Sequence, residues 1–189
     1  MKMKTRLLII LLTLNAFSLL MLSACSSSTA ANLEGDVYSQ SDGITAQDFT
    51  GIDVVTGESV SLADFEDNAV LLNFVNYGCS ESINQVVSSQ LLAIRDLTDE
   101  RDDFTPVSIF CGCCPTETLR NFATQNSFDW PWILDTDNSI INKYSDYLQT
   151  YGYPTLVLID NAQNIREVVG NTDANALSDK IDNLTIVEN

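Results

Sequence analysis

Cys79 is the first residue whose type and position suggest chemistry. It lies in the stretch YGCSES, shortly after the apolar run 69–75, and the residues that follow it have helical spacing. The dipole and free N–H groups of a helix N-terminus stabilise a thiolate, which is the nucleophilic form of cysteine. A second cysteine three residues on would complete Cys-x-x-Cys, but Ser82 stands there. Cys79 is therefore either a functional thiol with a partner elsewhere or an inert small residue.

The stretch CGCCP offers such a partner. It places Cys111, Cys113 and Cys114 within four residues, and Gly112 between them permits an unusual backbone conformation. One interpretation is a displaced resolving thiol that forms the redox disulfide with Cys79. A second is a soft-metal site, since three thiolates suit Cu(I) or zinc. A third is a structural disulfide, in which a bridge between adjacent cysteines would be strained.

The composition excludes several kinds of site. The 189 residues contain no histidine, which rules out His-ligated metals, Ser-His-Asp triads and Cys-His pairs. The net charge is −17, so the surface should repel nucleic acid, and we expect no nucleic-acid partner. The acidic residues are scattered, which is typical of a solvated surface. We expect no cofactor and no resident metal.

The N-terminal residues have the pattern of a secretory signal. A basic start is followed by an apolar stretch from Leu7 to about Leu22 and by the sequence LSAC. This ending resembles the bacterial lipobox, which implies cleavage before Cys25 and acylation of that cysteine. We therefore expect a signal peptide at 1–24, an acylated cysteine with a flexible tether at 25–45, and one domain at 46–189. Ser26, in place of aspartate, favours the outer membrane.

The rest of the chain alternates strands and helices. The apolar runs 69–76 and 104–111 predict buried strands, and an intervening helix would make them parallel, with Cys79 and the cysteine cluster at one sheet edge. Beyond Gly112, Cys113 or Cys114 should bend over Cys79 more easily than Cys111, which closes its strand. The other expected elements are hairpins within 48–62 and 155–169, an extended segment at 131–135, and helices at 80–99, 115–128, 138–148 and 173–184.

Four stretches in this order resemble the thioredoxin-like redoxins, namely the envelope thiol–disulfide oxidoreductases and their alkyl hydroperoxide reductase and thiol-specific antioxidant relatives. The stretches are DFTGIDVVTGESVSLADF, AVLLNFVNYGC, WPWILDTDNSIINKY and YGYPTLVLID with NIREVVG. The resemblance implies an α/β, thioredoxin-like three-layer fold, with a central mixed sheet, helices on both faces and an N-terminal β-hairpin extension. It maps the family's active thiol onto Cys79 and its cis-proline onto Pro154. Tyr77, Tyr153 and Thr155 beside these positions would help to bind substrate.

The chain departs from this family at informative positions. Gly78 replaces the aromatic residue before the active cysteine, and Ser82 replaces the second cysteine. Asn76 and Leu72 replace the threonine and proline of the peroxiredoxin pattern. Pro154 before an apolar run also predicts a tight turn into an edge strand.

We therefore predict a lipid-anchored thiol–disulfide oxidoreductase that faces the periplasm. Cys79 would act with Cys111, Cys113 or Cys114 on thiols or disulfides of envelope proteins, and only the N-terminal lipid would contact the membrane. The alternatives are a thiol peroxidase that uses Cys79, and a redox-inactive or soft-metal-binding lipoprotein on the same scaffold.

Overall fold

The structure is a computed structural model that describes residues 44–76, 85–112 and 114–185, all within one compact unit at 35–189. The described chain forms a six-stranded mixed sheet in the order β1-β8-β7-β4-β5-β6 and a separate two-stranded sheet, β2-β3. The strands are β1 (Ile44–Thr45), β2 (Thr50–Ile52), β3 (Ser59–Ser61), β4 (Ala69–Asn76), β5 (Phe104–Cys111), β6 (Trp132–Leu134), β7 (Thr155–Ile159) and β8 (Asn164–Val169).

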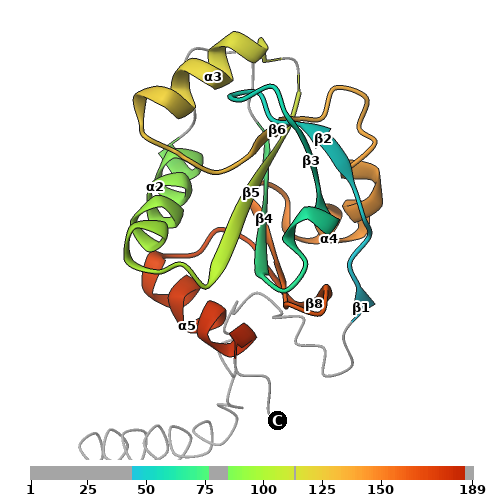
Figure 1. Cartoon of the computed structure of the whole chain (residues 1–189), viewed down its shortest axis with the longest axis vertical. Coiled ribbons are helices and arrows are strands. Elements are labelled where there is room, and N and C mark those ends of the chain that lie inside the picture. The colour runs from blue at the N-terminus through green and yellow to red at the C-terminus, as the bar shows by residue number, and fades with distance from the viewer. Residues whose placement is uncertain (1–43, 77–84, 113, 186–189) are drawn as a thin grey trace, which may run out of the picture. The chain divides into compact units, whose positions relative to one another are not determined.

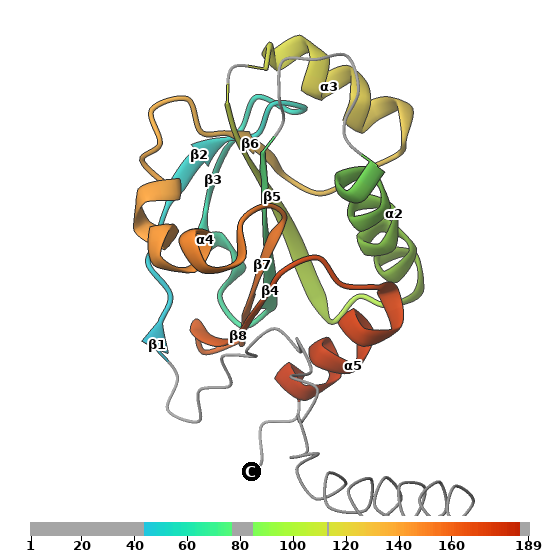
Figure 2. The same cartoon turned by 180° about the vertical axis from the view of Figure 1, so that it is seen from behind.

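Helices cover both faces of the large sheet (Figures 1 and 2), which confirms the predicted layers. One face packs against α2 (Gln85–Glu100), α3 (Thr116–Gln125) and α5 (Ala174–Thr185). The opposite face packs against α4 (Ser145–Tyr151) and the 3₁₀ turns η1 (Leu62–Phe65) and η2 (Ile141–Tyr144).

The central strand β4 explains why the core divides into two layers. Seven of its eight residues are buried, as the continuous apolar run predicts. Successive side chains of a strand point to opposite faces. Leu71 and Val75 therefore join the core under α2 and α5, whereas Leu72 and Phe74 join the core under α4. β4 and β5 are parallel, as predicted, and their register places Asn76 opposite Cys111 at the carboxyl ends.

The predicted N-terminal hairpin is confirmed as β2 and β3, which pair antiparallel around Gly57. It is fastened to the main sheet at Asp53, which forms an antiparallel bridge with Ile133 of β6. The Asp53 carboxylate also accepts hydrogen bonds from the backbone N–H groups of Val55, Thr56 and Trp132. The hairpin is thus an extension held against the edge strand β6.

The region predicted as one helix at 138–148 differs from that prediction. It begins only at Ile141, as a 3₁₀ turn, and continues as α4 to Tyr151. Asn138 has a φ of 59°, which is incompatible with a first helical residue, and no side chain caps the 3₁₀ turn at its N-cap residue, Ile140. Asp135 instead accepts the N–H groups of Ile140 and Ile141.

Two smaller differences concern α3 and β7. Pro115 precedes α3 rather than lying in its first turn, and α3 ends at Gln125 because Ser127 has a φ of 56°. The strand after Pro154 is not an edge strand, since β7 lies between β8 and β4.

None of the helices in the described ranges is long and apolar enough to cross a membrane.

Candidate active site

The ends of four strands, β4, β5, β6 and β7, meet at one edge of the sheet. Asn76 at the end of β4 lies opposite Cys111 at the end of β5, and Phe74 lies opposite Thr155 at the start of β7. Phe110 pairs with Leu134, so the residue that follows β6, Asp135, is beside them. Cys111 therefore lies at the same sheet edge as Asn76, the last residue of β4, which precedes Cys79 by three positions in the sequence. The predicted crossover from β4 to the parallel strand β5 requires this arrangement.

Cys111 is buried, and its thiol has polar neighbours on two sides. Its exposed fraction is 8%, and Sγ donates a hydrogen bond to the Val75 carbonyl oxygen at 3.4 Å. Burial raises the pKa of Cys111, the polar side chain of Tyr153 opposes this rise, and the Asp135 carboxylate adds to it. The neutral thiol is therefore favoured at rest.

The turn between α4 and β7 positions Tyr153. Gly152 ends α4 with a φ of 76°, and its N–H donates to the Leu148 carbonyl. Thr155 then donates its hydroxyl hydrogen to the Gly152 carbonyl oxygen at 2.6 Å. The Tyr153–Pro154 peptide bond is cis, as the resemblance implied, and Pro154 is buried. Tyr153 remains 36% exposed, so a partner molecule can reach it.

Cys114 has a different environment. It is 4% exposed, and the one hydrogen bond of its thiol to a described residue goes to the Pro115 carbonyl oxygen, 3.7 Å from Sγ. It packs in the apolar core with Phe110 and Leu119, and burial raises its pKa. Strand alternation places Cys111 on the face opposite Phe110. The thiols of Cys111 and Cys114 therefore lie on different faces of the sheet.

The soft-metal alternative gains no support from this geometry. Within residues 44–76, 85–112 and 114–185, no three Cys, Asp or Glu side chains are grouped so that they could hold a metal ion. Cys111 and Cys114 are free thiols. The unusual backbone expected at Gly112 is confirmed by its φ of 115°, which turns the chain between the two thiols.

Several predicted site residues lie outside the described residues, namely Cys25, Tyr77, Cys79, Ser82 and Cys113. Their roles remain predictions. Conversely, sequence reasoning missed Asp135, which is 4% exposed and lies beside Cys111. The sequence does contain a signal for this residue. In WILDTDN an acidic residue directly follows an apolar strand and precedes a turn.

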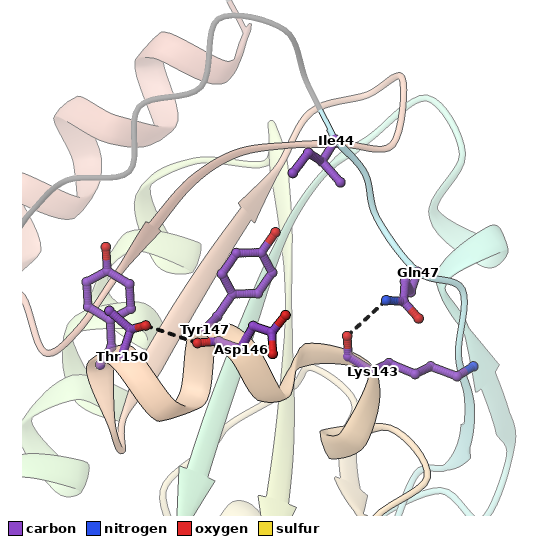
Figure 3. Close-up of a pocket in the computed structure, with 7 residues that line it drawn as sticks. Ile44, Gln47, Lys143, Asp146, Tyr147 and Thr150 are labelled. Carbon is purple, nitrogen blue, oxygen red and sulfur yellow. Dashed lines mark hydrogen bonds between the residues drawn. The ribbon is translucent and has the colours of Figure 1, made fainter.

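A pocket of about 340 Å³ lies between the N-terminal strand and α4 (Figure 3). Its lining residues are Ile44, Gln47, Lys143, Asp146, Tyr147, Thr150 and Tyr151. The Gln47 amide donates to the Lys143 carbonyl across its rim at 3.1 Å, as the close-up shows. Neither Cys111 nor Cys114 is among the described residues that line this pocket.

The chain is similar to known redoxins. Residues 43–168 match the family described as AhpC/TSA. No curated protein is significantly similar in sequence.

Three solved structures illustrate the similarity in fold. A DsbF homologue from Corynebacterium diphtheriae is 21% identical with a TM-score of 0.66, over 78% of this chain and 90% of that one. A thioredoxin-family thiol:disulfide interchange protein from Chlorobium tepidum is 19% identical with a TM-score of 0.63, over 77% and 99%. A secreted Mycobacterium tuberculosis disulfide oxidoreductase homologous to E. coli DsbE is 14% identical with a TM-score of 0.57, over 72% and 96%. At these identities the similarity establishes a thioredoxin-like fold.

Proposed function

Because the chain belongs to the AhpC/TSA family and has a thioredoxin-like fold, we propose that it is a thiol–disulfide oxidoreductase of the bacterial envelope. Cys79 is the attacking thiol, and one cysteine of the group Cys111, Cys113 and Cys114 resolves the mixed disulfide. Tyr77, Tyr153, Pro154 and Thr155 bind the partner chain.

One observation carries this proposal: the register of β4 and β5. Asn76, three residues before Cys79 in the sequence, lies opposite Cys111, so the strand that leads to the first thiol ends beside the second. Strand neighbours are about 4.8 Å apart, which is compatible with disulfide chemistry near this edge. Tyr153 and Asp135 bring two further polar groups to Cys111.

The proposed cycle balances as two thiol–disulfide exchanges. The Cys79 thiolate attacks one sulfur of a substrate disulfide, the substrate S–S bond breaks, and the released thiolate takes a proton from water. A resolving thiolate then attacks the Cys79 sulfur, which forms an internal disulfide and releases the second substrate thiol. An external dithiol donor reduces the internal disulfide with two electrons. In the oxidising direction the same steps run in reverse.

We also propose that the protein is anchored through an acylated Cys25 and faces the periplasm, at the outer membrane. Residues 1–24 would be the signal peptide and 25–45 the tether. The substrates are then thiols or disulfides of envelope proteins, in a compartment where disulfides persist. A structure of the same fold belongs to a secreted disulfide oxidoreductase, which is consistent with this location.

The experiment is a disulfide-exchange assay on the reduced full chain with a protein disulfide as substrate and a dithiol as the electron donor. Wild type should turn over, and Cys79→Ser should lose activity at least about 100-fold, since the nucleophile is removed. Ser82→Cys is the matched gain-of-function variant and should raise the rate by completing Cys-x-x-Cys.

Other outcomes would identify an alternative function. Faster turnover of hydrogen peroxide than of the protein disulfide would favour a thiol peroxidase. Unchanged exchange in Cys79→Ser would exclude Cys79 as the nucleophile. Stoichiometric zinc or copper in anaerobically purified protein, without exchange activity, would favour the metal-binding alternative.

A further inference from the structure

The pocket between the N-terminal strand and α4 has no role in the proposed exchange chemistry (Figure 3). Its volume of about 340 Å³ lies at the lower end of the range for ligand sites, roughly 300–1,000 Å³, so it has room for one long side chain. Ile44 and Gln47 form one wall. The other wall is one helical stripe along η2 and α4 with spacings of three and four residues, namely Lys143, Asp146, Tyr147, Thr150 and Tyr151.

Hydrogen bonds hold the two walls of the pocket together. The Gln47 amide donates to the Lys143 carbonyl at 3.1 Å, and the Tyr144 hydroxyl donates to the Gln47 carbonyl at 2.8 Å. The Lys143 ammonium donates to the Asp48 carbonyl. Ile44 is held by its antiparallel pairing with β8 in the main sheet. The pocket is therefore preformed, and the conformational entropy lost on binding is mainly that of the ligand.

The rings and the charges of the pocket suit a cation. Tyr147 and Tyr151 are four residues apart on α4, and both are partly buried against the core under that helix. Asp146 beside them is exposed, and none of the ion pairs among the described residues includes it. The Lys143 side chain extends away from Asp146 (Figure 3), and its ammonium is bound to the Asp48 carbonyl. Aromatic faces attract cations, and the Asp146 carboxylate adds an anion next to them.

We infer that this pocket binds an arginine side chain of the substrate protein. The inference deepens the proposed function and rests on it for the identity of the partner. A guanidinium stacks on aromatic faces, donates two parallel N–H groups to one carboxylate and is more weakly hydrated than an ammonium, so arginine suits the pocket better than lysine. The net charge of −17 also attracts basic partners over longer distances. The segment 26–43, which precedes Ile44, contains three acidic residues and no basic one, so it cannot supply the cation.

The pocket lies close to the turn that we propose binds the substrate chain. Tyr151 lines the pocket and ends α4, and Tyr153 follows it after Gly152. Two residues span at most about 7 Å, so one substrate segment can contact Tyr153 and place a nearby arginine in the pocket. The arginine would then lie within a few residues of the reactive cysteine of the substrate.

The first test measures binding without exchange chemistry. The probes are short peptides that have serine in place of the reactive cysteine and arginine at successive positions along the chain. Each has a matched peptide with citrulline, which has nearly the same shape but no charge. Calorimetry with the full chain should show, at the best position, about five- to tenfold tighter binding of the arginine peptide, and a smaller difference in high salt. Equal affinities at every position would overturn the inference.

Two substitutions remove the anion and one aromatic ring from the pocket. In Asp146→Asn and in Tyr147→Leu, the arginine peptide should bind no more than about twofold more tightly than the citrulline peptide. Asp146 is exposed, so its replacement should leave the fold intact. Asp99→Asn is the matched control, because Asp99 is an exposed acidic residue of α2, on the opposite face of the sheet, and should leave the preference unchanged. An equal loss in Asp99→Asn would overturn the inference, since the preference would then come from the overall negative charge.

Exchange kinetics complete the test with disulfide substrates that carry arginine or citrulline at the best position. Wild type should exchange the arginine substrate with a kcat/KM about five- to tenfold higher, and Asp146→Asn should exchange both substrates equally. Exchange by wild type at equal rates with both substrates would overturn the inference. Failure of the proposed function looks different: neither substrate is then exchanged, although the serine peptides still show the preference for arginine.

Discussion

Among the residues that the structure describes, three buried aspartates organise turns. Asp53 accepts the N–H of Trp132 and so links the β2–β3 hairpin to β6. Asp135 accepts the N–H groups of Ile140 and Ile141 at the start of η2. Asp160 accepts the N–H groups of Ala162 and Asn164 in the β7–β8 turn. Each of these three residues is at most 7% exposed. A buried carboxylate costs free energy unless it is hydrogen-bonded, and backbone N–H groups at turns would otherwise lack partners. Each aspartate therefore satisfies both requirements.

Asp53 gives a pH-dependent prediction. Burial would raise its pKa, but hydrogen bonds from the Thr56 side chain and from backbone N–H groups lower it on balance. A carboxylate with a lowered folded-state pKa contributes stability above its unfolded pKa of about 4, and loses that contribution as the pH falls through the folded value. Asp53→Asn should therefore reduce the free energy of unfolding by about 2–4 kcal/mol at pH 7, and by less at pH 3.

Urea unfolding at pH 7 and pH 3, followed by the fluorescence of the two buried tryptophans, measures this difference. Asp64→Asn is the matched control, because Asp64 is exposed and accepts one backbone N–H, from Ser61. The role of Asp53 would be contradicted if Asp53→Asn lowered the free energy of unfolding by no more than Asp64→Asn does. It would also be contradicted if this loss were larger at pH 3 than at pH 7.

At the scale of elements, the hairpin packs on β6 through a close backbone approach. Gly51 in the middle of β2 lies directly against Ile133, and a Cβ added there would be 2.5 Å from Ile133 Cγ2. Ile133 is 2% exposed and belongs to the core under α4, so it has little room to move. The absence of a side chain at Gly51 thus sets the distance between the hairpin and the sheet.

Gly51→Ala should therefore destabilise the protein by about 1–3 kcal/mol through overpacking. Gly170→Ala is the control, because its added Cβ would make only ordinary contact, 3.9 Å from Tyr151 Cδ1. Thermal unfolding of both variants tests this. If the two variants melt at the same temperature, the close approach at Gly51 does not limit the packing of the hairpin.

At the scale of the whole molecule, the charge and the N-terminal segment bear on location. The net charge of −17 disfavours binding to anionic headgroups, so a hydrophobic anchor would have to supply any stable membrane attachment. In our proposal the lipid on Cys25 supplies it.

Cys25→Ala should block processing and leave the uncleaved precursor, because the acylated cysteine defines the cleavage site in the lipobox pattern. Immunoblots of membrane and soluble fractions, with intact mass measurement, distinguish precursor from mature chain. Ser26→Ala, which leaves the cysteine in place, is the control and should be processed normally. A Cys25→Ala chain cut at the same bond and released would rule out lipidation.

The sequence by itself determined the order and type of most elements. The apolar run of β4, the strand ending at Cys111 and the hairpin around Gly57 follow from local periodicity and turn chemistry, which depend on neighbours in the chain. The same local rules failed at 138–148, where the cap is supplied by Asp135 rather than by the residues next to the helix.

Only the tertiary structure decided how the thiols differ. The sequence places Cys111 and Cys114 three residues apart with equal chemical character, but strand alternation and the turn at Gly112 direct them to different faces. One thiol then meets Tyr153 and Asp135 from elements far away in sequence, and the other meets the apolar core. A thiol's reactivity depends on the charges, donors and solvent that surround its sulfur, and folding alone brings these together.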